Sequence, residues 1–259
     1  MSDELLKPFI ERPEAAGVYL DFDGTLSEIV HLPSDARPVP GARELLAMLA
    51  ERFALVSVVS GRSADQLVEW LGGEIEIWGV HGAQRAVGGR VQVSDVAAPF
   101  EKLMATVRAQ AERRIEEMEL PGVVIEDKGV MVALHFRAAS DVEYARRTLD
   151  ELAESLATEH GLKRAGGRLA FELRPPIEVT KADVVLSRTR EESLFAAMFV
   201  GDDRVDLPAF DALDELAADG VTTVRVAVDS SEAPAELLAR ADIIVDGPVG
   251  TVALLRKLV

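Results

Sequence analysis

The sequence contains no cysteine, which excludes a disulfide framework and thiolate chemistry and suits a reducing compartment. The N-terminal segment lacks the basic start and the long apolar core of a signal peptide. The apolar runs, such as residues 194–200, are far shorter than the roughly 20 residues that cross a bilayer. We therefore expect a soluble, cytoplasmic protein without a membrane partner.

Positive charge is also scarce. There are 28 Lys and Arg residues against 45 Asp and Glu, which gives a net charge of -17. The averaged field repels nucleic acid, so we expect no nucleic-acid partner. It would repel a phosphorylated small molecule as well, and a site for such a ligand must therefore supply its own positive charge. The chain has 259 residues, of which 48% are hydrophobic, enough for one large or two ordinary domains.

Short apolar runs alternate with helical patterns in the first and last thirds of the chain. We expect core strands at residues 18–20, 53–59, 75–80, 196–200, 221–228 and 243–245. This alternation favours an α/β fold with a parallel sheet and helices on both faces.

The middle of the chain follows another pattern, in which a long helix precedes each of two strand pairs. The pairs are expected at 123–126 with 130–136 and at 162–165 with 168–173. We predict a discontinuous core of residues 1–96 and 176–259, interrupted by an inserted α+β cap at residues 97–175.

Polar residues follow three of the predicted core strands. The three segments are Asp21-Phe22-Asp23, Ser60-Gly61 and Gly201-Asp202-Asp203. Ligands of open α/β sheets bind beyond the carboxyl ends of the strands. We therefore expect these groups to converge on one edge of the sheet.

The two carboxylates of the first segment predict hydrolysis of a phosphate ester in two steps. Asp21 is the expected nucleophile, which forms a phospho-aspartate that water then hydrolyses. A turn at Gly24 can bring Asp23 over the same site. There Asp23 would act as general acid toward the leaving alcohol and then as general base toward the water.

Several acidic side chains beside a phosphate dianion would repel the substrate unless a cation were present. Oxygen-only ligands favour Mg²⁺, with Asp21, the carbonyl of Asp23 and Asp202 as the expected ligands. Asp203 would lie behind them as a supporting residue.

Four residues form the predicted phosphate site. The Lys181 ammonium and the Ser60 hydroxyl would hold phosphate oxygens, together with backbone amides. Gly61 and Thr25 belong to the same predicted site. These groups provide the local positive charge and the donors that the acidic chain requires.

Each of these segments, taken singly, also fits ordinary structure. Asp-x-Asp-Gly-Thr can be a capped turn, and Ser60-Gly61 a strand-to-helix junction. Lys181 fits a solvated helix residue, and Asp202-Asp203 fits acids at a helix start. Their common placement after apolar strands favours the catalytic interpretation.

Together these four segments resemble the signature of the haloacid dehalogenase superfamily. Within it, the chain resembles the trehalose-6-phosphate phosphatase family along nearly its whole length. Further matching segments are Ser60-Gly61-Arg62, Gly79-Val80-His81-Gly82, Glu126-Asp127-Lys128-Gly129, His135-Phe136-Arg137, Glu172-Leu173-Arg174-Pro175, and Gly201 to Asp206 with Phe210. The resemblance implies a Rossmann-like core, an inserted cap that grips the sugar, and hydrolysis of trehalose 6-phosphate.

The resemblance also implies sugar-binding residues. Glu126, Lys128 and Glu172 match positions that bind glucose hydroxyls, and Arg62 and His81-Gly82 match positions at the mouth of the site. Two departures stand out: Gln84 replaces a common glutamate, and Leu207-Pro208 occurs within the metal-side motif. Substrate contact and bracing of the cap both stay open for three further residues: His135, Arg137 and Arg174.

Other functions remain open at this point. The substrate could be another sugar phosphate, such as a sucrose or glucosyl-glycerol phosphate. A non-catalytic domain that binds sugar phosphates and regulates a trehalose-6-phosphate synthase is a second alternative, and phosphoryl transfer between sugar positions is a third. The four residues Asp21, Asp23, Lys181 and Asp202 favour hydrolysis.

Overall fold

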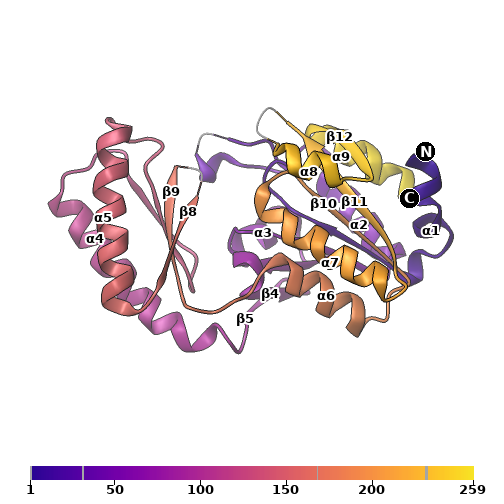
Figure 1. Cartoon of the computed structure of the whole chain (residues 1–259), viewed down its shortest axis with the longest axis horizontal. Helices are drawn as coiled ribbons and strands as arrows, with labels where there is room; N and C mark the ends of the chain where they lie inside the picture. Colours follow the sequence, from indigo (N-terminus) through magenta and orange to yellow (C-terminus); the bar gives the residue numbers. More distant parts are fainter. Residues whose placement is uncertain (1, 31, 168, 231–232) are drawn as a thin grey trace. The chain divides into compact units, whose positions relative to one another are not determined.

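The computed structural model describes residues 2–30, 32–167, 169–230 and 233–259. The chain divides into two compact units. The core unit comprises the chain up to Val30, Asp35–Gln92 and Val179–Val259, and the inserted unit comprises Val93–Glu178 with a short stretch that ends at Ser34. An eight-stranded sheet organises the core unit and a four-stranded sheet organises the inserted unit (Figure 1).

The strands of the large sheet follow the order β12-β11-β10-β1-β2-β3-β4-β5. They span Ala16–Leu20 (β1), Leu55–Val59 (β2), Glu76–Gly79 (β3), Gln84–Val87 (β4), Arg90–Val93 (β5), Ala196–Gly201 (β10), Thr222–Asp229 (β11) and Ile243–Asp246 (β12). Strands β12 to β3 in this order pair in parallel, and β4 pairs antiparallel with β3. The predicted α/β fold with a largely parallel sheet is confirmed.

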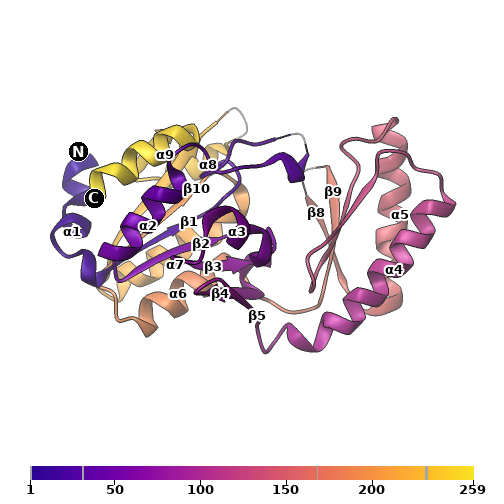
Figure 2. The same ribbon diagram turned by 180° about the vertical axis from the view of Figure 1, so that it is seen from behind.

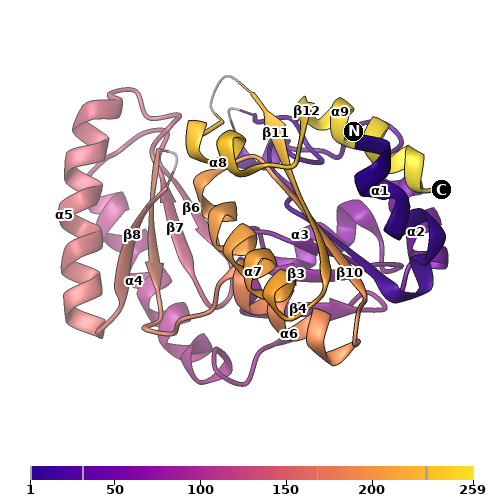
Figure 3. The same ribbon diagram turned by 45° about the vertical axis from the view of Figure 1, so that its right-hand side comes forward.

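Helices cover both faces of the large sheet because its central strands are apolar on both sides. Leu20 and its same-face neighbours pack with α1 (Ser2–Glu11), α2 (Ala42–Arg52), α3 (Ala64–Leu71) and α9 (Gly247–Leu255), seen in front of the sheet in Figure 2. Tyr19, which points the opposite way, packs with α6 (Lys181–Glu191), α7 (Leu207–Ala218) and α8 (Ala235–Arg240). Figure 3 shows α7 and α8 in front of β10 and β11.

The inserted unit is a four-stranded antiparallel sheet with two helices on one face. Its strands are β6 (Val124–Asp127), β7 (Val132–His135), β9 (Ala170–Arg174) and β8 (Lys163–Gly167), in that spatial order. Helices α4 (Glu101–Glu117) and α5 (Val142–His160) pack on the apolar side chains of alternate strand positions. The predicted first residue of the last strand, Arg168, lies outside the described residues.

Four elements were not predicted: α1, β4, β5 and α7. Half of the residues of β4 and half of those of β5 are polar, so both strands lack the continuous apolar run that marks the buried strands of this sheet. Short 3₁₀ turns cover Pro13–Ala15, Pro33–Asp35, Val80–Gly82, Ala98–Phe100, Arg204–Asp206 and Arg256–Leu258. Among the described helices, none is both long enough and apolar enough to span a bilayer.

Candidate active site

The carboxyl ends of three neighbouring strands bring the predicted catalytic segments together. Strand β1 lies between β10 and β2, and Leu20 is in register with Val200 on one side and Val58 on the other. Asp21 follows directly, and its amide donates to the carbonyl of Val200 at 2.9 Å. The segments that begin at Asp21, Ser60 and Asp202 thus leave the sheet side by side.

A tight turn follows Asp21. The carbonyl of Phe22 accepts from the amides of Leu26 at 2.8 Å and Ser27 at 3.0 Å. Gly24 has a φ of +78°, a conformation that favours glycine. A Cβ at this position would also lie 2.0 Å from Oδ2 of Asp202. The turn therefore requires glycine both for its backbone conformation and for its contact with the acidic cluster.

Three carboxylates form a buried cluster beside this turn. Asp21, Asp202 and Asp206 each offer an oxygen, and these oxygens lie within 4.8 Å of one another. Their residues are 5%, 1% and 0% exposed. Such a concentration of buried negative charge needs compensation by cations.

Lys181 supplies one of these cations. It is the first residue of α6, whose N-terminus is closed by the capping box of Thr180 and Asp183. Its Nζ lies 2.8 Å from Asp21 Oδ1 and 2.6 Å from Asp206 Oδ1. Burial alone would lower the pKa of Lys181, but the two carboxylates outweigh it and raise the pKa, so the ammonium stays charged.

The nucleophile candidate sits in an unusual electrostatic environment. Burial raises the pKa of Asp21 to about 7, opposed by the charge of Lys181 and reinforced by that of Asp206. A second positive charge close to Asp21 would therefore favour its ionised form.

Asp206 was named in the sequence only as part of a matching segment, and its role in the site was missed. Its Oδ2 accepts from the amides of Asp202 and Asp203, both at 3.0 Å, while its Oδ1 accepts from Lys181. It therefore fixes the loop after β10. The available signal was the capping-box spacing of Asp203 and Asp206. The side chain of Asp203 itself accepts from the amide of Arg204 at 2.6 Å.

The residues present fit a divalent cation. Three carboxylates and one ammonium leave an excess of negative charge, and oxygen donors are what Mg²⁺ prefers. Both oxygens of Asp206 already accept hydrogen bonds, so Asp21 and Asp202 are the carboxylates best placed to be ligands.

Of the other predicted phosphate residues, Thr25 follows β1, and Ser60 and Gly61 follow the neighbouring strand β2. Ser60 is 1% exposed, and its Oγ accepts from the amide of Arg62 at 3.3 Å, which leaves its own proton for a ligand oxygen. Thr25 is fully buried, and its Oγ1 has no hydrogen-bond partner within the described parts of the chain. Gly61 lies under the His81 ring, whose Cε1 would be 2.9 Å from a Cβ there.

The residues predicted at the mouth of the site have mixed placements. Arg62 forms two hydrogen bonds with Asp23. His81 has a φ of +58°, and Gly82 packs closely against Val179, whose Cγ1 would lie 2.8 Å from an added Cβ. Gln84 is 4% exposed and accepts from the backbone at the start of α3, so this departure serves the core fold.

The predicted sugar residues cluster on the face of the inserted sheet opposite its helices. Lys128 lies between Glu126 at 3.6 Å and Glu172 at 3.8 Å, and its residue is 7% exposed. His135 Nε2 is 2.8 Å from Glu126, and Arg174 pairs with Glu172. Both neighbours therefore brace the carboxylates predicted to meet the sugar. A further residue of the same matching segments, Arg137, is half-buried after β7.

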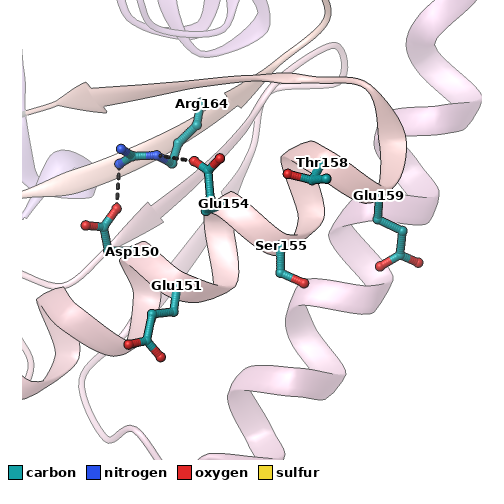
Figure 4. A pocket seen from close by; sticks show the side chains of 7 residues that line it. All are labelled: Asp150, Glu151, Glu154, Ser155, Thr158, Glu159 and Arg164. Carbon is teal, nitrogen blue, oxygen red and sulfur yellow. Dashed lines mark hydrogen bonds and ion pairs between the residues drawn. The ribbon is translucent and has the colours of Figure 1, made fainter.

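A separate hollow lies along α5 in the inserted unit (Figure 4). Seven residues line it: Asp150, Glu151, Glu154, Ser155, Thr158, Glu159 and Arg164. Arg164 is neutralised by Asp150 at 2.6 Å and by Glu154 at 3.1 Å. The remaining acidic lining repels phosphate, so this hollow is not a candidate for the predicted site.

Comparison with known proteins agrees with this geometry. The sequence profile described as trehalose-phosphatase matches residues 19–242. The chain belongs to the trehalose-phosphatase family. The trehalose-phosphate phosphatase of Mycolicibacterium paratuberculosis (strain ATCC BAA-968 / K-10) is 37% identical over 237 residues, covering 86% of this chain and 58% of that protein. The chain thus spans less than two thirds of this relative's length.

Solved structures of other proteins share the fold of this family member. A trehalose-6-phosphate phosphatase related protein matches with a TM-score of 0.78 and 24% identity, covering 93% of this chain and 96% of that chain. The C-terminal domain of the trehalose-6-phosphate phosphatase of C. albicans matches with a TM-score of 0.75 and 21% identity, covering 99% of this chain and 96% of that domain. Both matches confirm the predicted fold class.

Proposed function

We propose that the protein is a Mg²⁺-dependent phosphatase that hydrolyses trehalose 6-phosphate to trehalose and phosphate through a phospho-aspartate at Asp21. The observation that carries this proposal is the buried group of Asp21, Lys181, Asp202 and Asp206 at the carboxyl edge of the sheet, in a chain of the trehalose-phosphatase family. This arrangement combines a nucleophile, a fixed cation and oxygen ligands for a metal.

In the first step, an oxygen of Asp21 attacks phosphorus and the bond to the sugar oxygen breaks. The departing sugar oxygen takes a proton from Asp23, and Asp23 becomes a carboxylate. Lys181 already lies 2.8 Å from Asp21 Oδ1, so its charge is placed to hold an oxygen of the transferring phosphoryl group. The hydroxyls of Ser60 and Thr25 would donate to further phosphate oxygens.

In the second step, water attacks phosphorus and the bond to Asp21 breaks. Asp23 now removes a proton from that water, which restores its acid form for the next turnover. Asp21, the Asp23 carbonyl and Asp202 would hold Mg²⁺, whose charge would reduce the repulsion between the carboxylate and phosphate oxygens. Asp206 and Asp203 support these ligands through the loop that follows β10.

The inserted unit is the proposed cap domain that sets specificity. Lys128 forms ion pairs with both Glu126 and Glu172, which gives a preorganised set of acceptors and donors for sugar hydroxyls. Within the core unit, the backbone of His81 and Gly82 would line the mouth of the site. We further propose that the protein acts in the cytoplasm, and that a trehalose-6-phosphate synthase supplies its substrate.

A phosphate-release panel with and without EDTA tests the function. We expect phosphate from trehalose 6-phosphate only with Mg²⁺, and slower release from glucose 6-phosphate, sucrose phosphate and glucosyl-glycerol phosphate. Faster turnover of one of these would assign that sugar phosphate instead. Binding of trehalose 6-phosphate without turnover would favour a regulatory, non-catalytic role, and an isomeric sugar phosphate as product would indicate phosphoryl transfer.

A further inference from the structure

The guanidinium of Arg62 binds both carboxylate oxygens of Asp23. Arg62 Nε donates to Asp23 Oδ2 at 2.8 Å, and Arg62 Nη2 donates to Oδ1, also at 2.8 Å. Two parallel hydrogen bonds of this kind fix both the position and the plane of a carboxylate. The side chain of Asp23 is 40% exposed, whereas that of Arg62 is 8% exposed. Without this partner, a carboxylate so open to solvent would sample several rotamers.

The guanidinium is itself held on several sides. Its Nη1 donates to Gln66 Oε1 at 3.1 Å. Its central carbon lies 5.0 Å from the ring centroid of Trp70 and 5.6 Å from that of Phe22. These two rings stack on each other at 5.3 Å. Cation-π contacts and a third hydrogen bond, to Gln66, leave Arg62 little freedom, so its side chain holds Asp23 in a fixed position.

Hydrogen bonds and close packing also fix the backbone at Arg62. Its carbonyl accepts from the amide of Val80 at 2.8 Å, and Val80 adopts a φ of +49°, which a β-branched residue rarely tolerates. A Cβ on Gly79 would lie 2.3 Å from the amide nitrogen of Ala64, so this approach requires glycine. Gln84 Oε1 accepts from the same Ala64 amide at 2.8 Å. The segment around residues 79–84 thus frames the turn that carries Arg62.

We propose that Arg62 is the positioning residue for Asp23, setting where that side chain stands for proton transfer to the substrate oxygen and from the water. The two bonds hold the carboxylate form that acts as base, and the acid form keeps the bond to its unprotonated oxygen. The inference rests on the proposed function, in which Asp23 moves these protons. Three hydrogen bonds commit the guanidinium to Asp23 and Gln66. Arg62 therefore acts through another side chain, and sugar contact is not its main role.

Two substrates with different leaving groups separate these roles. The sugar alkoxide of trehalose 6-phosphate needs a proton in order to leave, whereas p-nitrophenolate leaves from p-nitrophenyl phosphate without one. For Arg62→Met we expect kcat on trehalose 6-phosphate to fall by about 10- to 100-fold, with KM changing by less than about threefold. The fall in kcat/KM, which reports only the steps up to departure of the leaving group, should be several times smaller on p-nitrophenyl phosphate. Arg62→Lys should recover part of the lost kcat.

The double variant gives a second, independent readout. If Arg62 acts through Asp23, Arg62→Met should slow Asp23→Asn by less than about threefold, because the acid is already gone. Gln66→Leu, which removes the hydrogen bond from Arg62 Nη1, should reproduce the kcat effect more weakly. Arg52→Met removes a positive charge from an exposed site of the core unit and serves as the control, as does the melting temperature of every variant.

Four results would overturn the inference. A rise in KM for trehalose 6-phosphate with unchanged kcat would make Arg62 a sugar contact. Equal losses of kcat/KM on both substrates, or losses that multiply in the double variant, would make its role independent of Asp23. If Asp23→Asn lowered kcat/KM equally for both substrates, Asp23 would not be the acid, and the proposed mechanism would fall together with the role of Arg62. If Asp23→Asn behaves as expected and only the Arg62 variants give one of these results, the role of Arg62 is wrong and the proposed mechanism stands.

Discussion

The backbone of Gly24 lies directly against the carboxylate of Asp202, so close that a Cβ at residue 24 would be 2.0 Å from Oδ2. Gly24→Ala must therefore displace a proposed metal ligand and strain a backbone with a φ of +78°. We expect a loss of about 1–3 kcal/mol in the free energy of unfolding. The Mg²⁺ concentration that supports half-maximal activity should rise at least about tenfold.

Gly88→Ala is the matched control for Gly24→Ala. Gly88 also has a positive φ, +57°, but nothing lies within 4 Å of the position of an added Cβ. Gly88→Ala should lower the free energy of urea unfolding through backbone strain. The Mg²⁺ concentration that supports its half-maximal activity should not change. An unchanged Mg²⁺ requirement in Gly24→Ala would show that Asp202 does not depend on this contact.

Lys181→Met should destabilise the protein strongly, because it leaves Asp21 and Asp206 buried without their shared cation. Removing one partner of a buried ion pair typically lowers the free energy of unfolding by about 3–5 kcal/mol. Mg²⁺ should restore part of that stability, since it replaces the missing charge. Urea unfolding with EDTA and with Mg²⁺ measures both effects. Equal stability of wild type and variant in EDTA would contradict this account of the cluster.

The elevated pKa of Asp21, about 7, predicts a specific pH dependence. A carboxyl whose pKa is higher in the folded than in the unfolded state stabilises the fold fully below its ordinary pKa of 3.8. That contribution is lost as the pH rises through about 7. In EDTA, the stability of wild type relative to Asp21→Asn should therefore fall between about pH 4 and about pH 7. Parallel stability profiles of the two proteins would contradict the shift.

The same pKa makes metal binding release a proton. Below about pH 7 Asp21 holds a proton in the metal-free protein, and a Mg²⁺ ligand must be ionised. Mg²⁺ affinity should rise with pH up to about 7 and then level off. Titration calorimetry in two buffers with different ionisation enthalpies would count the released protons. A proton count of zero at about pH 6 would contradict the assignment of Asp21 as a ligand.

Glu126→Gln tests the proposed sugar site in the inserted unit. The change removes the charge that lies 3.6 Å from Lys128 and 2.8 Å from His135, while the shape of the side chain is kept. We expect KM for trehalose 6-phosphate to rise about tenfold, with a smaller change in kcat. Asp127→Asn is the control, since the neighbouring carboxylate pairs with Arg108 on the exposed surface. Equal KM values for the two variants would remove Glu126 from the site.

The parallel sheet and the meeting of its strand ends could be predicted because they depend on local signals. An apolar run followed by Asp21, Ser60 or Asp202 marks both a buried strand and its polar end. The elements that were missed lack such signals. The helix α1 contains Pro8, which argues against a helix, and β5 has no buried residue among its four.

The side-chain partnerships within the site could not be predicted in the same way. Asp206 and Lys181 are 25 positions apart, and Arg62 and Asp23 are 39 apart. Each of these contacts depends on the packing of separate elements, which no local pattern records. The resemblance therefore implied a place for Arg62 at the mouth of the site, but its two hydrogen bonds to Asp23 appear only in the structure.

The central strand pairing has a consequence for how the protein folds during synthesis. Strand β1 pairs with β10, with Ala16 opposite Ala196, so the chain must be made past the inserted unit before Asp21 can meet Lys181, Asp202 and Asp206. The strands and helices of the inserted unit all lie within Val93–Glu178, so this unit can fold before β10 has been synthesised. The catalytic edge should thus form only after the inserted unit has been synthesised, and its pairing of distant strands should be slow.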